Sequence, residues 1–568
     1  MSSVADLLAE APGAYTRPPV RPLSSLIDHP VVLAAASGLA SLALLGRHVI
    51  PLGGIVEPGG DYGLMVWNLW IVNRAITHGQ NPYFTSLVYH PLGARLVKHT
   101  LVVGYWPITF LTQLVSRGDP SYPLYAYRLS ILVSFTLALA LAFAMLRRLG
   151  FPPAVACVPA LGYAFCDFNI LHVPHLNHLS AAFFLPLAAL TLIRLVQRPG
   201  TARAAAAGFV LALGVYFTEL VVFLWIAALL AAAMAVALPS TRAEVRRVVA
   251  TLGGRRVIAG LLAFTLTVAP FAANWMLDSG KAPNPRQASN WSANLAAFVV
   301  PRPDATPLYG GTFAGASAAI SKGIAGHEVF LGFPMLLLAA IGIVRRPRGW
   351  TLVAAALALV FVVLSLGPTL KVGGMSTGWP MPYALLMRVP PFDMGRTPVR
   401  CVLLAVFALT FPAAGGLAWV RERIGARWGM GSARAVALFF LAWTVAEVYS
   451  PGPVTARYTP PAALGALVPG PVVNIPLSVF DGRAVFLQTF HGHAIATGFV
   501  SRRTPAQLAH VRTLDLLLSE NPAAFVRQLG RIGVRNVILG PGTPPDVAAA
   551  LTAAAINVVD LRDEAPVH

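Results

Sequence analysis

Charged residues are what this sequence has least of. Asp, Glu, Lys and Arg make up 11% of its 568 residues, whereas hydrophobic residues make up 56%. A soluble chain of this size carries charge on roughly a quarter of its residues. The shortage excludes an ordinary soluble globular protein and indicates that a lipid bilayer surrounds most of the chain.

Cysteine is scarce as well. The three thiols, Cys157, Cys166 and Cys401, lie in or beside apolar segments. They are too few and too scattered for a disulfide framework or a metal knuckle. Their expected role is packing.

Acidic residues are outnumbered, 22 against 42 Lys and Arg, which gives a net charge of +20. On a soluble domain such an excess would suggest a nucleic-acid partner. Here most of the basic residues occupy short segments between apolar blocks: Arg147, Arg148, Arg194, Arg198, Arg203, Arg242, Arg246, Arg247, Arg255, Arg256, Arg345, Arg346, Arg348, Arg421, Arg423, Arg427 and Arg434. The positive-inside rule places these segments in the cytoplasm, so the charge predicts topology and no nucleic-acid partner.

The apolar blocks are close to the ~20 residues of one helical crossing and predict a polytopic α-helical bundle. With the arginine segments inside, we expect eleven spans, at 29–50, 123–146, 152–166, 179–195, 204–218, 220–238, 257–276, 329–345, 350–366, 398–419 and 435–450. The block 204–238 is short for two full crossings. We interpret it as a hairpin that turns at Thr218 and Glu219.

This topology divides the chain into a cytoplasmic tail (1–28), a membrane domain (29–450) and a domain outside the cytoplasm (451–568). In the last part, the pattern predicts strands at 472–477, 484–488, 534–539 and 556–561 and helices at 504–519, 522–529 and 546–554. Strands that alternate with helices predict a small α/β domain.

The first outer loop, 51–122, contains two notable runs. Residues 64–76 have apolar positions at helical spacing, with Trp67 and Trp70 three apart, which favours a helix lying in the membrane interface. Residues 101–115 are interrupted by a proline and are expected to lie along the membrane or dip into it rather than span it.

Asp61 follows the first span and a Pro-Gly-Gly turn. An acid held at the membrane surface is costly unless it has a partner or a role. Asp61 is therefore a candidate functional residue. Capping of the helix that follows is the alternative interpretation, because Asp is a favoured N-cap residue.

Short motifs along the chain resemble the GT-C glycosyltransferase superfamily. The pieces similar to the first outer loop of its bacterial members are Gly60-Asp61, Trp67-Asn68-Leu69-Trp70, Gly79-Gln80-Asn81-Pro82-Tyr83, Tyr89-His90-Pro91-Leu92-Gly93 and Lys98-His99-Thr100. The pieces similar to a branch of the superfamily are 172–178, 328–332, 366–368, 382–383, 396–400, 488–492 and 501–503.

The resemblance implies an enzyme of the bacterial inner membrane. It would transfer a sugar, a hexose or a pentose, from a polyprenyl-phosphate-linked donor to a glycan, lipid or protein outside the cytoplasm. It also implies that Asp61 is the general base that takes the proton of the acceptor hydroxyl. The candidate cations for the donor phosphate are Lys98, His99, Arg396 and Arg400. For the lysine and the two arginines, snorkelling to lipid head groups is the alternative.

Other side chains are candidate substrate contacts: Glu57, Tyr62, His172, His175, His178 and Glu219. The spacing of the three histidines would also suit a transition metal, although a proline interrupts any helix there. A divalent metal ion held by Glu57 and Asp61 stays open. The non-functional interpretations are interfacial packing for the histidines and solvation at the hairpin turn for Glu219.

Two other functions and one further set of residues complete the sequence-based predictions. The chain would alternatively be a transporter or flippase of lipid-linked substrates, or a non-catalytic glycan-binding scaffold. Transporters commonly have polar or broken helices at the midplane, whereas polar residues here cluster outside the spans, which disfavours a transporter. In the last domain, the candidates for acceptor contact or solvated surface are Gln488, His491, His493, Arg502 and Arg503.

Overall fold

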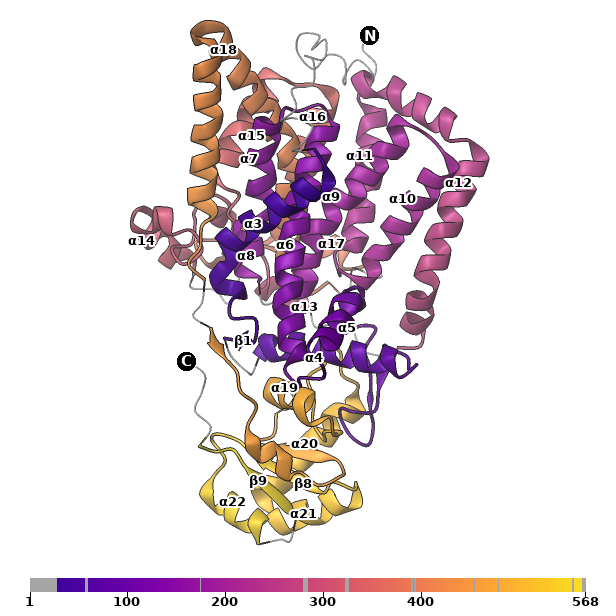
Figure 1. The fold of residues 1–568 in the computed structure, drawn as a ribbon, viewed down its shortest axis with the longest axis vertical. Coiled ribbons are helices and arrows are strands. Elements are labelled where there is room, and N and C mark those ends of the chain that lie inside the picture. The colour runs from indigo at the N-terminus through magenta and orange to yellow at the C-terminus, as the bar shows by residue number, and fades with distance from the viewer. Residues whose placement is uncertain are drawn as a thin grey trace.

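The computed structural model shows a helical bundle with a smaller module at one end (Figure 1). The described residues are 28–56, 60–173, 175–278, 285–321, 326–389, 392, 395–452, 455–478, 480–553 and 556–563. The module follows the last bundle helix in the chain and lies at the end opposite the turn of α18.

Among the described residues, ten apolar helical segments make up the bundle. Five are long and apolar enough to cross a membrane: α3 (Pro30–Val49), α6 (Tyr122–Arg148), α7 (Pro153–Ala164) continued by α8 (Asp167–Leu171), α12 (Pro239–Met276), and α18 (Val402–Val448) with the preceding turn η6 (Pro398–Cys401). Five described apolar segments are shorter: Ala182–Gln197 of α9 (Leu176–Gln197), α10 (Thr201–Leu213) with η2 (Gly214–Tyr216), α11 (Val221–Ala237), α15 (Phe333–Arg345) and α16 (Gly349–Ser365). The chain is thus a multi-pass membrane protein, and the number of eleven crossings stays a prediction.

Two of the long helices bend at a glycine. The backbone of Gly253 in α12 has φ 58°, and that of Gly429 in α18 has φ 81°. Glycine adopts this left-handed conformation without steric cost, so each helix can turn there. The spans predicted at 398–419 and 435–450 are the two arms of α18. The segment from 239 to 253, predicted as a loop, is helical.

The bundle packs closely where glycines let backbones meet. A Cβ atom built at Gly416 of α18 would collide with the carbonyl oxygen of Leu338 on α15, and one built at Gly342 would collide with that of Pro412. Small residues at such crossings allow the dispersion contacts that hold membrane helices together.

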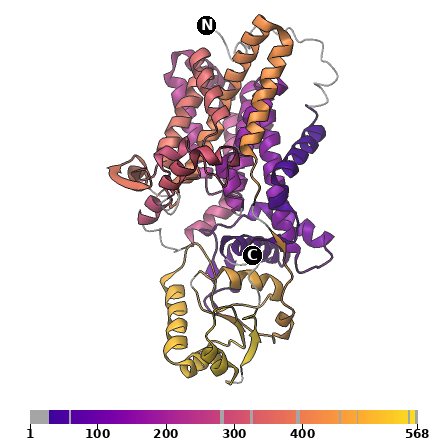
Figure 2. The same cartoon turned by 90° about the vertical axis from the view of Figure 1, so that its left-hand side faces the viewer.

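The first outer loop forms α4 (Gly60–Thr77), β2 (Phe84–Thr85), β3 (Ala94–Arg95), η1 (Val103–Tyr105) and α5 (Trp106–Val115). The predicted helix is confirmed, but its predicted interfacial surroundings are not. Trp67 is fully buried and Trp70 is 5% exposed, because α4 is sandwiched between the bundle and the module (Figure 2). Asp61 lies in the first turn of the helix and is not its N-cap residue.

Short elements connect the bundle helices on the side of the module or flank it: α13 (Pro285–Asn290), η3 (Leu295–Phe298), η4 (Pro307–Tyr309), α14 (Gly310–Ile320), β4 (Thr369–Val372), β5 (Met375–Pro380) and α17 (Tyr383–Leu386). Strands β4 and β5 form an antiparallel hairpin.

The module contains a three-stranded parallel sheet in the order β7 (Val472–Ile475), β8 (Asn536–Leu539), β9 (Asn557–Asp560). Val472 pairs with Asn536, which pairs with Asn557. The helices are η7 (Ala462–Ala466), α19 (Gly482–His491), α20 (Pro505–Glu520), α21 (Pro522–Arg531) and α22 (Pro545–Thr552). Strand β6 (Ala456–Arg457) pairs with β1 (Gly54–Ile55) after the first span, which ties the module to the bundle.

One predicted strand of the module is wrong. Residues 484–488 belong to α19, whose N-cap residue, Asp481, accepts a hydrogen bond from the Ala484 amide. A short apolar run fits a buried strand or a buried helix equally well by periodicity. Packing against α4 decided in favour of the helix.

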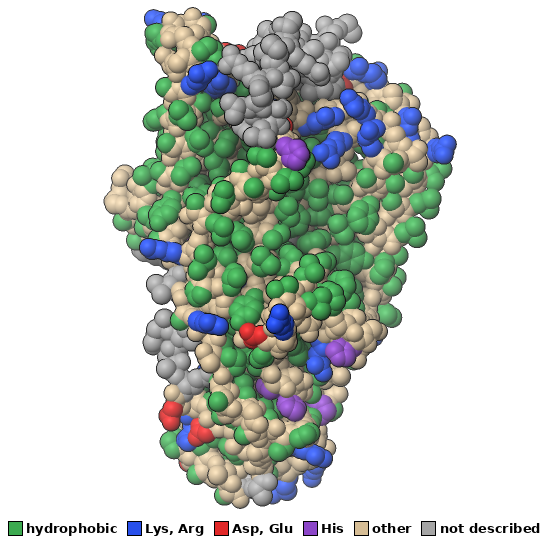
Figure 3. Space-filling model, in the orientation of Figure 1, with side chains coloured by type: hydrophobic (Ala, Val, Ile, Leu, Met, Phe, Trp, Pro, Cys, Tyr) green, Lys and Arg blue, Asp and Glu red, His purple; other side chains and the backbone are tan. Residues whose placement is uncertain are grey.

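The distribution of side-chain types on the surface agrees with a membrane-embedded bundle and an aqueous module. In Figure 3, hydrophobic side chains cover the bundle, most Lys and Arg gather at the end far from the module, and His lies mostly near the module. The arginines of α12 that precede its bend are at this far end (Figure 1). The arrangement agrees with arginine segments on one side of a bilayer and the module on the other.

Candidate active site

Asp61 and His175 meet where α4 begins beside the amino end of α9. His175 Nε2 donates a hydrogen bond to Asp61 Oδ2 at 2.8 Å, and the two side chains are 28% and 50% exposed respectively. This hydrogen bond lowers the pKa of Asp61 from its usual value against the opposing effect of burial. The result is an ionised carboxylate that is oriented by an imidazole and still open to a substrate.

Two arginines that precede α18 in the chain lie near this carboxylate. Arg396 and Arg400 both contribute to the lowered pKa of Asp61. The Arg400 guanidinium forms an ion pair with Glu219, and its Nε finds no hydrogen-bond acceptor among the described residues. We refer to Asp61, His175, Glu219, Arg396 and Arg400 as the Asp61 cluster.

Glu219 lies between η2 and α11, at the turn of the predicted hairpin. Burial acts to raise the pKa of its carboxyl, but Arg400, Arg396 and Arg502 together lower it. Glu219 is therefore ionised and paired with Arg400, and its side chain is still 44% exposed, so solvation at the turn contributes as well.

His99 is buried beside α4 and bridges two elements. Its Nε2 lies 2.9 Å from Asn68 Oδ1, and its Nδ1 accepts from the Ser501 amide at 2.9 Å. Burial lowers the pKa of His99 to about 3, so the ring is neutral. Donor-phosphate binding by His99 stays a prediction, and a neutral imidazole would act there as a hydrogen-bonding group and not as a cation.

Lys98 points to the end of α12. Its ammonium donates to the Asp278 carbonyl oxygen and lies 5.4 Å from the centre of the Trp275 ring. These described contacts are with α12, whereas those of the two arginines are with Glu219 and Asp61. Lys98 as a phosphate ligand stays a prediction.

The remaining predicted contacts fall around the cluster. The Tyr62 ring packs edge to face against Tyr127, with centroids 6.4 Å apart. His172 stacks on Phe168 with a centroid distance of 4.1 Å, and its ring lies 5.7 Å from that of His175. Glu57 and the side chain of His178 lie outside the described residues.

The described residues do not fit a metal centre. In the described ranges, no three His, Cys, Asp or Glu side chains converge closely enough to hold an ion. His172 Nδ1 contacts the Phe168 carbonyl oxygen at 2.7 Å, and His175 faces Asp61. A metal ion held by Glu57 and Asp61 stays a prediction, because Glu57 lies outside the described residues.

The module contributes a residue whose position sequence reasoning missed. The sequence predicts acceptor contact or solvated surface for Arg502, whereas its charge interacts with those of Glu219, Arg396 and Arg400. By contrast, Gln488 is fully buried and accepts a hydrogen bond from Trp67 Nε1 at 2.7 Å. The Ser-Arg-Arg motif was the only sequence signal, and it does not indicate which surface the arginine faces.

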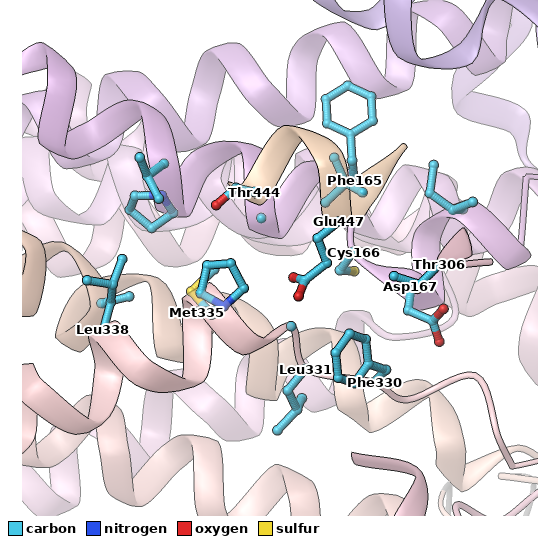
Figure 4. A pocket seen from close by; sticks show the side chains of 18 of the residues that line it. Phe165, Cys166, Asp167, Thr306, Phe330, Leu331, Met335, Leu338, Thr444 and Glu447 are labelled. Carbon is cyan, nitrogen blue, oxygen red and sulfur yellow. The ribbon is translucent and has the colours of Figure 1, made fainter. Parts of the chain in front are cut away.

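A separate pocket lies between α7, α15 and α18. Figure 4 shows Glu447 among the apolar side chains of Phe330, Leu331 and Met335. Glu447 Oε2 accepts from the Phe333 amide and the Tyr309 hydroxyl, each at 2.9 Å. No member of the Asp61 cluster lines this pocket. It contains a second acid, Asp167, so only one of its two carboxylates, that of Glu447, is occupied by these hydrogen bonds.

Comparison with known proteins finds similarity in structure only. No protein-family model and no curated protein sequence matches the chain. The oligosaccharyltransferase AglB from Archaeoglobus fulgidus, solved with an inhibitory peptide and a dolichol-phosphate, is 13% identical with a TM-score of 0.51, and the match covers 89% of this chain and 69% of AglB. The arabinofuranosyltransferase AftD from Mycobacteria is 14% identical with a TM-score of 0.51. That match covers 88% of this chain and 34% of AftD, so this chain spans about a third of that protein.

These likenesses extend over nearly the whole chain, whereas the motif resemblance rests on short pieces. At such low identity they establish the fold. The chain is a multi-pass membrane protein whose fold is similar to those of AglB and AftD.

Proposed function

We propose that this protein is a membrane glycosyltransferase that moves a sugar from a polyprenyl-phosphate-linked donor to an acceptor outside the cytoplasm. The observation that carries the proposal is the Asp61 carboxylate, hydrogen-bonded to His175 and set beside Arg396 and Arg400. An ionised acid next to two guanidinium groups combines a general base with groups that can bind a phosphate. The fold shared with AglB and AftD supports this class of reaction.

The transfer needs one bond formed and one broken. The acceptor hydroxyl oxygen attacks the anomeric carbon of the sugar while the bond from that carbon to the phosphate oxygen breaks. Asp61 takes the hydroxyl proton, and the electron pair of the broken bond leaves with polyprenyl phosphate. Attack opposite the leaving group inverts the anomeric centre.

The cluster suits both halves of this step. His175 holds the Asp61 carboxylate in one orientation, which keeps the base aimed at the acceptor. We assign the leaving phosphate to Arg396 and Arg400, whose charges act on Asp61, because arginine binds phosphate oxygens with two parallel hydrogen bonds. Glu219 fixes Arg400 and keeps it from turning away.

The same cluster supports a proposal for the chemical class of each substrate. The donor is a lipid-linked sugar, hexose or pentose, because the guanidinium groups of Arg396 and Arg400 beside the base suit the phosphate of such a donor. The acceptor is an envelope glycan, lipid or protein hydroxyl that reaches Asp61 from the aqueous side. The half-exposed Asp61 side chain leaves room for it.

The test is Asp61→Asn, compared with Asp119→Asn. Asp119 lies in the same outer loop, where it accepts hydrogen bonds from the Ser121 amide and the Tyr125 hydroxyl. Both variants should insert into the membrane, but only Asp61→Asn should lose sugar transfer from a radiolabelled polyprenyl-phosphate donor. Full transfer by Asp61→Asn would refute the assignment of the base.

A further inference from the structure

The C-terminal module docks on the first outer loop through buried polar contacts. Trp67 Nε1 donates to Gln488 Oε1 at 2.7 Å, and both side chains are fully buried. Gln507 Nε2 donates to the Gly93 carbonyl oxygen at 2.7 Å. Buried polar groups are costly to leave unpaired, so these bonds favour one position of the module on the bundle.

His99 extends this docking to the Asp61 cluster. The Ser501 amide donates to His99 Nδ1 at 2.9 Å, so Nε2 carries the hydrogen and donates to Asn68 Oδ1 at 2.9 Å. A neutral imidazole satisfies both partners in this tautomer. Asn68 belongs to α4, the helix whose first turn contains Asp61, so Ser501 and the segment that follows it are held against this helix.

Arg502 is the next residue along this segment. It is partly buried, and its Nη1 donates a hydrogen bond to the Ser501 carbonyl oxygen at 3.3 Å. Its charge also interacts with those of Arg396, Glu219 and Arg400. Three guanidinium groups thus gather with two carboxylates, those of Glu219 and Asp61, which leaves an excess of positive charge. Bringing like charges together out of bulk water is unfavourable unless an anion balances them.

We propose that Arg502 completes the donor-phosphate site, so that the module is part of the transfer site and not a separate binding domain. The inference rests on the proposed function and assigns the module a role in it. The ligand group is the phosphate of the lipid-linked donor, and after transfer the phosphate of the polyprenyl product. An acceptor glycan alone would not need a third arginine at this place.

The test measures binding without requiring transfer. Polyprenyl monophosphate and the uncharged polyprenol of the same length are titrated into the purified full chain in lipid nanodiscs. Arg502→Ala should weaken polyprenyl phosphate binding about ten- to a hundredfold, the range for loss of hydrogen bonds to a charged group. Polyprenol binding should not change. The affinity of Arg502→Lys for polyprenyl phosphate should lie between those of the wild type and Arg502→Ala, because lysine keeps the charge but cannot form two parallel hydrogen bonds.

Arg503→Ala is the matched control. Its guanidinium lies 3.9 Å from the centre of the Phe480 ring, within the module. This variant removes an equal charge one residue away and should bind polyprenyl phosphate like the wild type. Equal binding of polyprenyl phosphate by Arg502→Ala and wild type would overturn the inference alone, as would an equal loss of phosphate and polyprenol binding. A wild-type chain that binds polyprenyl phosphate no more tightly than polyprenol would overturn the proposed function as well.

Discussion

The hydrogen bond between His175 and Asp61 can be tested by replacing His175. The variant should change both the orientation of the Asp61 carboxylate and its pKa, and the two effects can be measured separately. Replacing His175 with alanine removes the Nε2 donor 2.8 Å from the carboxylate and leaves the backbone before α9 in place. The carboxylate then loses its fixed orientation. Burial, which acts to raise the pKa of Asp61, is no longer opposed by its largest counteracting influence.

The expected loss follows from the exposure of the pair. Hydrogen bonds to charged groups contribute about 1.5–3 kcal/mol when they are well shielded. Here the side chains are 28% and 50% exposed, so water screens the interaction and about 1 kcal/mol is the appropriate size. At tenfold per 1.36 kcal/mol, His175→Ala should lower kcat about fivefold near neutral pH.

The pH profile provides the sharper measurement. Asp61 must be ionised to accept a proton, so activity falls as the pH drops through its pKa. In the wild type the lowered pKa of Asp61 places this acidic limb below the usual range of a carboxylic acid, and in His175→Ala the limb should move to higher pH.

The assay is the transfer rate from a labelled polyprenyl-phosphate donor across the acidic range, for wild type, His175→Ala and His78→Gln. His78 is exposed at the other end of α4 and should leave both rate and profile unchanged. An acidic limb that stays in place or moves to lower pH in His175→Ala would refute the pairing of these residues in the working site.

Two further predictions test the bundle and its orientation. Gly416→Ala should destabilise the protein by about 1–3 kcal/mol in a thermal unfolding assay, because the added Cβ collides with the α15 backbone. A Cβ at Gly415 meets nothing within 4 Å, so Gly415→Ala should be neutral. Equal stability of the two variants would contradict the close packing of α15 and α18. For orientation, Arg512→Cys in the module should react with a membrane-impermeant maleimide in intact cells, while Arg255→Cys should react only after lysis. Both positions are exposed, and the opposite labelling pattern would reverse the predicted topology.

The sequence by itself was sufficient for the membrane character of this protein. Long apolar blocks and arginines between them depend on composition over about twenty neighbouring residues, which is a local property. For the same reason it located the helix after Asp61 and the turn at Glu219. It failed at 484–488, where a short apolar run had two possible partners and only contact with α4 selected the helix.

The site itself was decided by tertiary structure. Asp61 and His175 are 114 residues apart, Glu219 and Arg400 are 181 apart, and His99 and Ser501 are 402 apart. Each residue could be singled out as polar beside an apolar segment, but periodicity does not encode which polar groups face each other. That choice depends on how the bundle helices pack and on the buried bonds that seat the module on α4, because only these contacts bring distant charges within reach of one another.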